Sequence, residues 1–154
     1  MSADDPVATF CLMNKWHRQE EAIPVMTMEQ IRGNGEHILI VEDEPVVRDM
    51  ASEMLKTLGY LPVGVASGEE AVCYLEQHQA HLVMLDMLMR PGINGRETYE
   101  RILAITPGQR AIVVSGFADS AEINRTLQLG ASQLVKKPYT LCELGVAIKK
   151  ALFG

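Results

Sequence analysis

Three acidic side chains follow short apolar runs in this sequence of 154 residues. Glu42 and Asp43 come after the run 37–41, and Asp86 comes after the run 81–85. If both runs are neighbouring parallel strands, the three carboxylates meet at one edge of one sheet. Two like charges ~4 Å apart repel by about 1 kcal/mol in water and by roughly 4 kcal/mol at an effective dielectric near 20. The pattern therefore predicts a site that holds a cation.

Two further polar side chains follow later apolar runs. Ser115 comes directly after the run 111–114, and Lys137 stands just before Pro138. A hydroxyl and an ammonium group both donate hydrogen bonds to phosphoryl oxygens. Magnesium usually takes one or two carboxylates, keeps several waters and is completed by phosphate oxygens. The five side chains thus divide into an acidic half suited to Mg²⁺ and a donating half suited to phosphate.

The elements that position these residues alternate regularly from residue 36 onward. Five strands alternating with five helices predict an α/β fold with helices on both faces of a parallel sheet. Right-handed crossovers favour a flavodoxin-like doubly wound sheet of order 2-1-3-4-5, whose ligands bind beyond the carboxyl ends of the strands where the order reverses. The predicted strands are 37–41, 61–65, 81–85, 111–114 and 133–135; the helices begin near Pro45, Ser67, Gly95, Ser120 and Thr140.

Composition limits the class of protein. Hydrophobic residues make up 47% and the net charge is -6, which predicts one globular domain, residues 36–154, and no electrostatic footprint for nucleic acid. No apolar stretch reaches membrane-spanning length and no secretory signal pattern is present, so we expect a cytoplasmic protein without membrane contact. Cys11, Cys73 and Cys142 are widely spaced, which favours free thiols in a reducing compartment.

The first 35 residues differ from the remainder. They carry Pro6 and Pro24 and end in the turn-forming triplet 33–35 (Gly-Asn-Gly), which predicts a tail and linker. A helix within 7–21 would place three of its larger side chains on one face. The two interpretations are a partly ordered tail and an arm for docking or dimerisation.

The five polar residues and their flanking motifs resemble the response-regulator receiver domain of two-component signalling, over residues 36–154. Residues 40–45 (Ile-Val-Glu-Asp-Glu-Pro) resemble the acidic-pair motif, and Asp86 stands at the phosphoacceptor position. Residues 113–116 (Val-Val-Ser-Gly) and 135–139 (Val-Lys-Lys-Pro-Tyr) match the switch-hydroxyl and lysine motifs. The resemblance implies a cis peptide bond before Pro138.

The resemblance also implies a mechanism. Asp86 would attack the phosphorus of a phosphohistidine on a histidine kinase or histidine phosphotransfer domain, so the chain is a signalling phosphoacceptor rather than an enzyme. Mg²⁺ would be held by Asp43, Asp86 and the backbone carbonyl of Leu88, with Glu42 acting mainly through water. Lys137 and Ser115 would bind the phosphoryl oxygens. The face formed by the fourth predicted helix, the fifth strand and the final helix would then repack, binding an unidentified output partner or a second copy of the chain.

Three departures from the family pattern bear on output and lifetime. The acidic pair is Glu-Asp rather than Asp-Asp. The loop after Asp86 is one residue longer than the common pattern, with Arg90 before Pro91, as in receivers of hybrid sensor kinases. Leu134 occupies the position of the usual switch aromatic, which predicts a weaker or differently routed output.

The side chains expected to flank the phosphoryl group are Leu88 and Phe117. Neither can orient an attacking water, so we expect slow hydrolysis of the phosphorylated aspartate. The chain ends just after the last predicted helix, which is consistent with a single-domain regulator or with the receiver segment of a hybrid kinase.

Three other functions are weighed against the same residues. A magnesium phosphatase of the haloacid-dehalogenase type needs a second aspartate two residues after the first, where Leu88 stands. A flavodoxin-like binder of FMN would meet acidic repulsion at residues 42–44. A receiver-like docking module that works without phosphorylation would not need all five polar residues, which are present.

Overall fold

The computed structural model describes residues 26–116 and 120–154. The strands are β1 (His37–Val41), β2 (Leu61–Val65), β3 (Leu82–Asp86), β4 (Ala111–Ser115) and β5 (Gln133–Lys136). The helices of these residues are α2 (Met28–Ile31), α3 (Pro45–Thr57), α4 (Gly68–Gln77), α5 (Gly95–Ile105), α6 (Ala121–Gln128) and α7 (Leu141–Phe153).

The five strands form one parallel sheet in the order β2-β1-β3-β4-β5, which confirms the predicted flavodoxin-like topology. The order in which strands are added to the sheet reverses between β1 and β3, which is the switch point of this fold. In the register of these two strands Val41 lies opposite Leu85. Glu42 therefore follows β1 at the level at which Asp86 ends β3.

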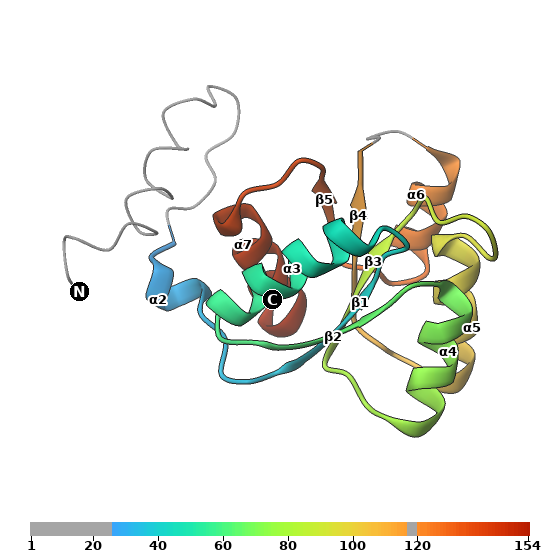
Figure 1. Cartoon of the computed structure of the whole chain (residues 1–154), viewed down its shortest axis with the longest axis horizontal. Helices are drawn as coiled ribbons and strands as arrows, with labels where there is room; N and C mark the ends of the chain where they lie inside the picture. The colour runs from blue at the N-terminus through green and yellow to red at the C-terminus, as the bar shows by residue number, and fades with distance from the viewer. Residues whose placement is uncertain (1–25, 117–119) are drawn as a thin grey trace.

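Helices cover both faces of the sheet (Figure 1). On one face α3 and α7 pack against alternate side chains of the central strands, including Ile40 and Met84. On the other face α4, α5 and α6 pack against the intervening residues, including Val41 and Leu85. Because both faces are buried, β3 and β4 are buried along their whole length, as expected of a central parallel strand.

Side-chain caps fix the beginnings of five helices, including α2, where the Thr27 side chain accepts a hydrogen bond from the amide of Gln30. Ser67, Asn94, Ser120 and Thr140 each accept a hydrogen bond from the backbone amide three residues later. Such a bond satisfies an amide that the first helical turn leaves unpaired. At α4 the side chain of Glu70 accepts from the amide of Ala66 at 2.7 Å, one residue before the position that a capping box requires.

A short helix lies inside the segment expected to be a linker. In α2, Met28 and Ile31 are buried against the core on the α7 side. Ile31 lies so close to Gly145 of α7 that a Cβ there would come within 2.9 Å of its side chain. Residues 28–31 therefore pack as part of the folded unit, whereas the expected helix within 7–21 lies outside the described residues.

The cysteines differ from the expectation of three free thiols. Cys73 is free and exposed, but Cys142 is disulfide-bonded. Cys11 lies outside the described residues.

No helix of the described residues is long and apolar enough to cross a membrane.

Candidate functional site

The three predicted acidic side chains lie together at the carboxyl end of the sheet. Oxygen atoms of Glu42, Asp43 and Asp86 all lie within 4.8 Å of one another. Glu42 and Asp86 are only 4% and 7% exposed, because each follows or ends a strand that is covered on both faces. The strand register explains this convergence, since parallel strands present their carboxyl ends at one edge.

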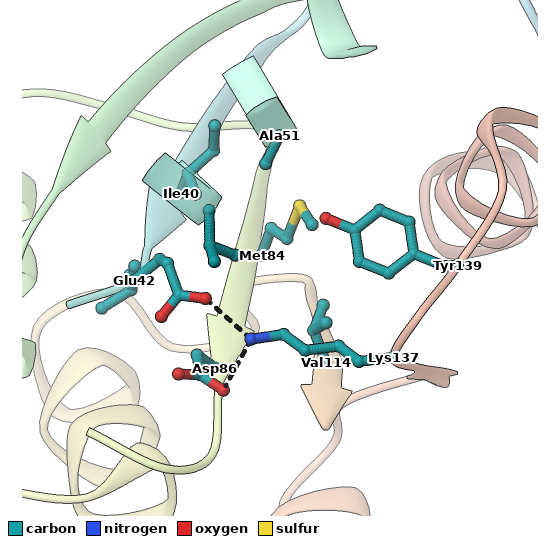
Figure 2. A pocket seen from close by; sticks show the side chains of 10 residues that line it. Ile40, Glu42, Ala51, Met84, Asp86, Val114, Lys137 and Tyr139 are labelled. Atoms are coloured by element: carbon teal, nitrogen blue, oxygen red, sulfur yellow. Dashed lines mark hydrogen bonds and ion pairs between the residues drawn. The ribbon is translucent and has the colours of Figure 1, made fainter. Parts of the chain in front are cut away.

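Lys137 reaches into the acidic cluster from the segment that follows β5. Its Nζ lies 2.7 Å from Glu42 Oε1 and 3.5 Å from Asp86 Oδ1. Figure 2 shows the lysine side chain extending from the segment after β5 to a point between the two carboxylates. The peptide bond between Lys137 and Pro138 is cis, as the family resemblance implies; the bond between Arg90 and Pro91 is also cis.

The charges of these groups alter their acidity. Burial raises the pKa of Asp86 to about 7, with further upward contributions from a hydrogen bond and charge repulsion with Glu42. Lys137 opposes this increase but does not cancel it. Burial alone would lower the pKa of Lys137, but its hydrogen bond to Glu42 and the two negative charges raise it above the ordinary value. The site therefore stabilises the ammonium form and makes the Asp86 carboxylate costly.

Ser115 ends β4 beside the acidic cluster. It is 2% exposed, and its carbonyl accepts a hydrogen bond from the amide of Lys137 at 2.8 Å. Asp86 pairs with Val114 in the ladder between β3 and β4, so Ser115 stands one residue beyond the level of Asp86. The backbone bond couples the segments that carry the predicted hydroxyl and lysine.

The loop after Asp86 is tied to the acidic site through its backbone. The amide of Leu88 donates to Asp86 Oδ1 and the amide of Arg90 donates to Asp43 Oδ2, each at 3.4 Å. These distances are longer than those of a strong hydrogen bond. The Leu88 side chain is 53% exposed, so it lies at the surface next to the cluster.

A small cavity of about 10 Å³ lies beside the acidic site, close to the space that one water needs. Its lining is mainly apolar and includes Ile40, Ala51 and Met84. The ring of Tyr139 also lines it, beside Met84 and Lys137 (Figure 2). The sequence motif that contains Tyr139 predicts no role for it, because no sequence pattern shows that its ring faces this cavity.

The donor set fits a hard divalent cation. Magnesium prefers oxygen ligands and usually binds one or two carboxylates while it keeps several waters. The carboxylate oxygens here lie within 4.8 Å of one another, and waters kept by the ion would make the contacts that the carboxylates do not make directly. Among the described residues, Glu42, Asp43 and Asp86 are therefore the acidic side chains able to hold Mg²⁺.

Two further residues enter the predictions on hydrolysis and on output. Phe117 lies outside the described residues. Leu134 is partly buried in β5, packed against the core on the α4–α6 face of the sheet, where it fills the position of the switch aromatic with an aliphatic side chain.

Comparison with known proteins extends these observations. The sequence is 32% identical over 118 residues to the sporulation initiation phosphotransferase F of Bacillus subtilis, covering 77% of this chain and 94% of that protein. It is also 32% identical over 115 residues to a cyclic di-GMP phosphodiesterase of Thermotoga maritima, of which it spans only 30%. The chain spans about half the length of several other relatives, such as the transcriptional regulatory protein CrdR of Helicobacter pylori at 53%.

Solved structures of receiver domains are also similar to this chain. A CheY-like receiver domain protein from Methanospirillum hungatei matches with a TM-score of 0.72 and 28% identity, over 77% of this chain and 94% of that one. The receiver domain of a sensor histidine kinase from Pseudomonas aeruginosa, solved with a magnesium ion coordinated in its active-site cleft, matches with a TM-score of 0.71 and 28% identity, over 78% of this chain and 99% of that one.

The family model for the response regulator receiver domain matches residues 38–149. This match covers most of the chain and includes the acidic cluster, Ser115 and Lys137. Together with the sheet order and the carboxylates at its switch point, it establishes that the chain belongs to the receiver-domain family of two-component response regulators.

Proposed function

We propose that the chain is a phosphoacceptor module in which Asp86 receives a phosphoryl group from the phosphohistidine of a histidine kinase or histidine phosphotransfer domain. The observation that carries this proposal is the meeting of Asp86 with Glu42, Asp43 and Lys137 at one sheet edge. An Asp86 oxygen forms the new bond to phosphorus while the bond from phosphorus to the imidazole nitrogen breaks. The imidazole leaves with the electron pair of that bond.

The residues of the chain would supply positioning and charge. Lys137 would neutralise phosphoryl oxygens as negative charge accumulates, and Ser115 would donate a hydrogen bond from the end of β4. Glu42, Asp43, Asp86 and the Leu88 carbonyl would hold Mg²⁺, directly or through water, and the bound ion would supply charge neutralisation at the phosphoryl group. Preorganised charge and in-line positioning are the main sources of catalysis in phosphoryl transfer.

Phosphorylation would bias a two-state surface. A phosphoryl group brings more negative charge and stronger acceptor oxygens than a carboxylate, which gives Ser115 a better partner. Movement of Ser115 would pull on the start of α6 and repack the face formed by α6, β5 and α7. A change from 1:99 to 99:1 in such a switch needs about 5.5 kcal/mol of differential stabilisation.

The cellular setting follows from the same proposal. We place the protein in the cytoplasm, with residues 36–154 as the receiver unit, residues 1–35 as a tail and linker, and slow self-dephosphorylation. The longer loop after Asp86 favours kinship with hybrid sensor kinases, and a second copy of the chain is one candidate for the α6–β5–α7 face. Direct nucleic-acid binding and membrane contact are not part of the proposal.

The test is mass spectrometry after incubation with acetyl phosphate and Mg²⁺. We expect the wild-type protein to gain one phosphoryl group, and Asp86→Asn and the wild type with EDTA to gain none. A folded wild-type protein that gains no mass from acetyl phosphate or from a phosphorylated histidine phosphotransfer domain would instead favour a docking module that works without phosphorylation.

A further inference from the structure

The long loop after Asp86 packs against the folded domain through alternate side chains. Met87 and Met89 are buried at 5% and 3% exposure, whereas Leu88 and Arg90 between and after them are exposed. The buried methionines pack into the core beneath α4 and α5. Alternate side chains thus anchor the backbone directly after the phosphoacceptor candidate.

The carboxyl-terminal end of this loop is hydrogen-bonded to an acidic residue of α4. Glu69, in the first turn of α4, accepts a hydrogen bond from the backbone amide of Ile93 at 3.0 Å. This bond is the main reason that the pKa of Glu69 is lowered. The side chain of Ile93 is buried, and a Cβ on Gly68 would lie 2.7 Å from it. Backbone and side chain of Ile93 therefore both dock on the start of α4.

Gly92, which precedes Ile93, also lies directly against Glu69. Gly92 has a φ of 115°, a conformation that side chains other than glycine rarely adopt. A Cβ at this position would lie 2.9 Å from both carboxylate oxygens of Glu69. The backbone of the loop thus passes directly against the Glu69 carboxylate.

The same loop reaches the acidic cluster at its other end, where the amide of Arg90 donates to Asp43. Two carboxylates, Asp43 before α3 and Glu69 in the first turn of α4, therefore hold one loop. Asp86 and Leu88 lie at the beginning of that loop. We propose that Glu69 is a positioning residue of the phosphoacceptor site, acting through the loop rather than on the phosphoryl group. This inference rests on the proposed phosphorylation of Asp86.

A simpler role for Glu69 is to place negative charge at the amino end of α4, where an acidic residue is favourable. Glu70 already places a carboxylate in the same turn and bonds the amide of Ala66 instead. The two roles are separable because glutamine at position 69 keeps an oxygen acceptor for the Ile93 amide but removes the charge.

The experiment compares Glu69→Ala, Glu69→Gln and the matched control Glu76→Ala, an exposed acidic residue of the same helix. The initial rate of mass gain from acetyl phosphate is measured across Mg²⁺ concentrations. We expect Glu69→Ala to lower the rate by about tenfold, less than the roughly 100-fold that a misplacement of about 1 Å can cost, and to raise the Mg²⁺ concentration for half-maximal rate. Glu69→Gln should keep most of the rate, and Glu76→Ala should match the wild type.

Hydrogen exchange of the Ile93 amide supplies a readout independent of phosphorylation. The amide should exchange faster in Glu69→Ala than in the wild type and be protected again in Glu69→Gln, with thermal unfolding of all variants near that of Glu76→Ala. A wild type that takes up phosphoryl groups while Glu69→Ala does so equally fast would overturn the positioning role alone. Equal loss in Glu69→Ala and Glu69→Gln would assign the effect to charge and also overturn it. A wild type that takes up none overturns the proposed function and the inference with it.

Discussion

The ammonium of Lys137 lies closer to Glu42 than to Asp86, at 2.7 Å against 3.5 Å. The lysine is therefore held mainly by the residue that follows β1, leaving the Asp86 oxygens less engaged. The family more often has the shorter aspartate at this position, and the longer glutamate reaches the ammonium directly. Lys137 neutralises the buried acids in part, and a divalent cation bound by the proposed site would share that task.

The first prediction concerns Lys137→Ala. Removing the ammonium leaves buried Glu42 and Asp86 without their basic partner, so we expect a loss of stability of about 2 kcal/mol in EDTA. Mg²⁺ should stabilise this variant more than it stabilises the wild type, because the cation replaces the missing charge. Phosphoryl uptake should fall by roughly a hundredfold. Urea unfolding with and without Mg²⁺ measures the first effect, with the exposed Lys136→Ala as control; equal stabilisation of both variants by Mg²⁺ would contradict it.

The second prediction concerns pH. Burial and the neighbouring Glu42 raise the pKa of Asp86 to about 7 from an ordinary 3.8, so the folded protein binds this proton more tightly than the unfolded chain. The resulting stabilisation is complete below the ordinary pKa and is lost as the pH rises through 7. In metal-free buffer Asp86→Asn should therefore be more stable than the wild type at pH 8, by on the order of 2 kcal/mol.

That difference should become smaller as the pH falls toward 5, because the wild-type carboxyl is then protonated. Urea unfolding at several pH values measures it. Added Mg²⁺ should stabilise the wild type at high pH, since the cation binds the ionised form. Parallel stability curves for the two proteins would show that Asp86 titrates near its ordinary value.

The third prediction concerns the lifetime of the phosphorylated protein. Leu88 is 53% exposed beside the acidic cluster, and an aliphatic side chain cannot orient a water for attack on phosphorus. We expect Leu88→Gln to accelerate hydrolysis by about tenfold, less than the roughly 100-fold at which full general-base activation of water begins, because an amide can orient a water but not deprotonate it. The decay of the phosphorylated mass after removal of the donor measures this, with Leu88→Met as the apolar control. A wild-type half-life of only seconds would contradict the slow hydrolysis on which this prediction depends.

Much of the site can be predicted from the sequence because regular parallel strands bring its residues to one edge of the sheet. Apolar runs define the central strands, and parallel pairing brings Glu42 level with Asp86 through the register of Val41 and Leu85. The expected bounds of β1 and β2 agree with the structure; those of β4 and β5 differ by one residue at the carboxyl end, and β3 is shifted by one residue at both ends. These differences in strand bounds are small because the buried side chains of a strand that is covered on both faces fix its register.

Other features could not be predicted because they depend on tertiary contacts. The helix α2 has four residues, too few to show a period. Thr27 and Gln30 form a capping box at its start, but the burial of Met28 and Ile31 depends on the core that they cover. The bond from Ile93 to Glu69 joins residues 24 positions apart and has no sequence signal. Whether Lys137 prefers Glu42 or Asp86 is likewise decided by side-chain reach within the folded site.

The fourth prediction tests the packing of the segment before β1. A Cβ on Gly33 would lie 2.3 Å from the ring of Tyr60, and this ring is buried at 2% exposure. Gly33→Ala should therefore destabilise the protein by about 1–3 kcal/mol, as expected for overpacking in a core. Urea unfolding measures it, with the adjacent exposed Asn34→Ala as control. Equal stability of both variants would mean that this segment detaches from the domain without cost.

The last prediction concerns signal output. Leu134 cannot rotate as an aromatic switch, and the first turn of α6 is tied to α5 by the ion pair of Arg96 and Glu122 at 2.5 Å. An acyl-phosphate mimic on Asp86 should therefore shift amide resonances around Ser115 and the start of α6 but produce small changes along α7. The same mimic added to Asp86→Asn should change nothing. A ligand shifts an equilibrium only by its differential contacts with the two states, so large changes throughout α7 would show that another residue relays the signal in place of the aromatic.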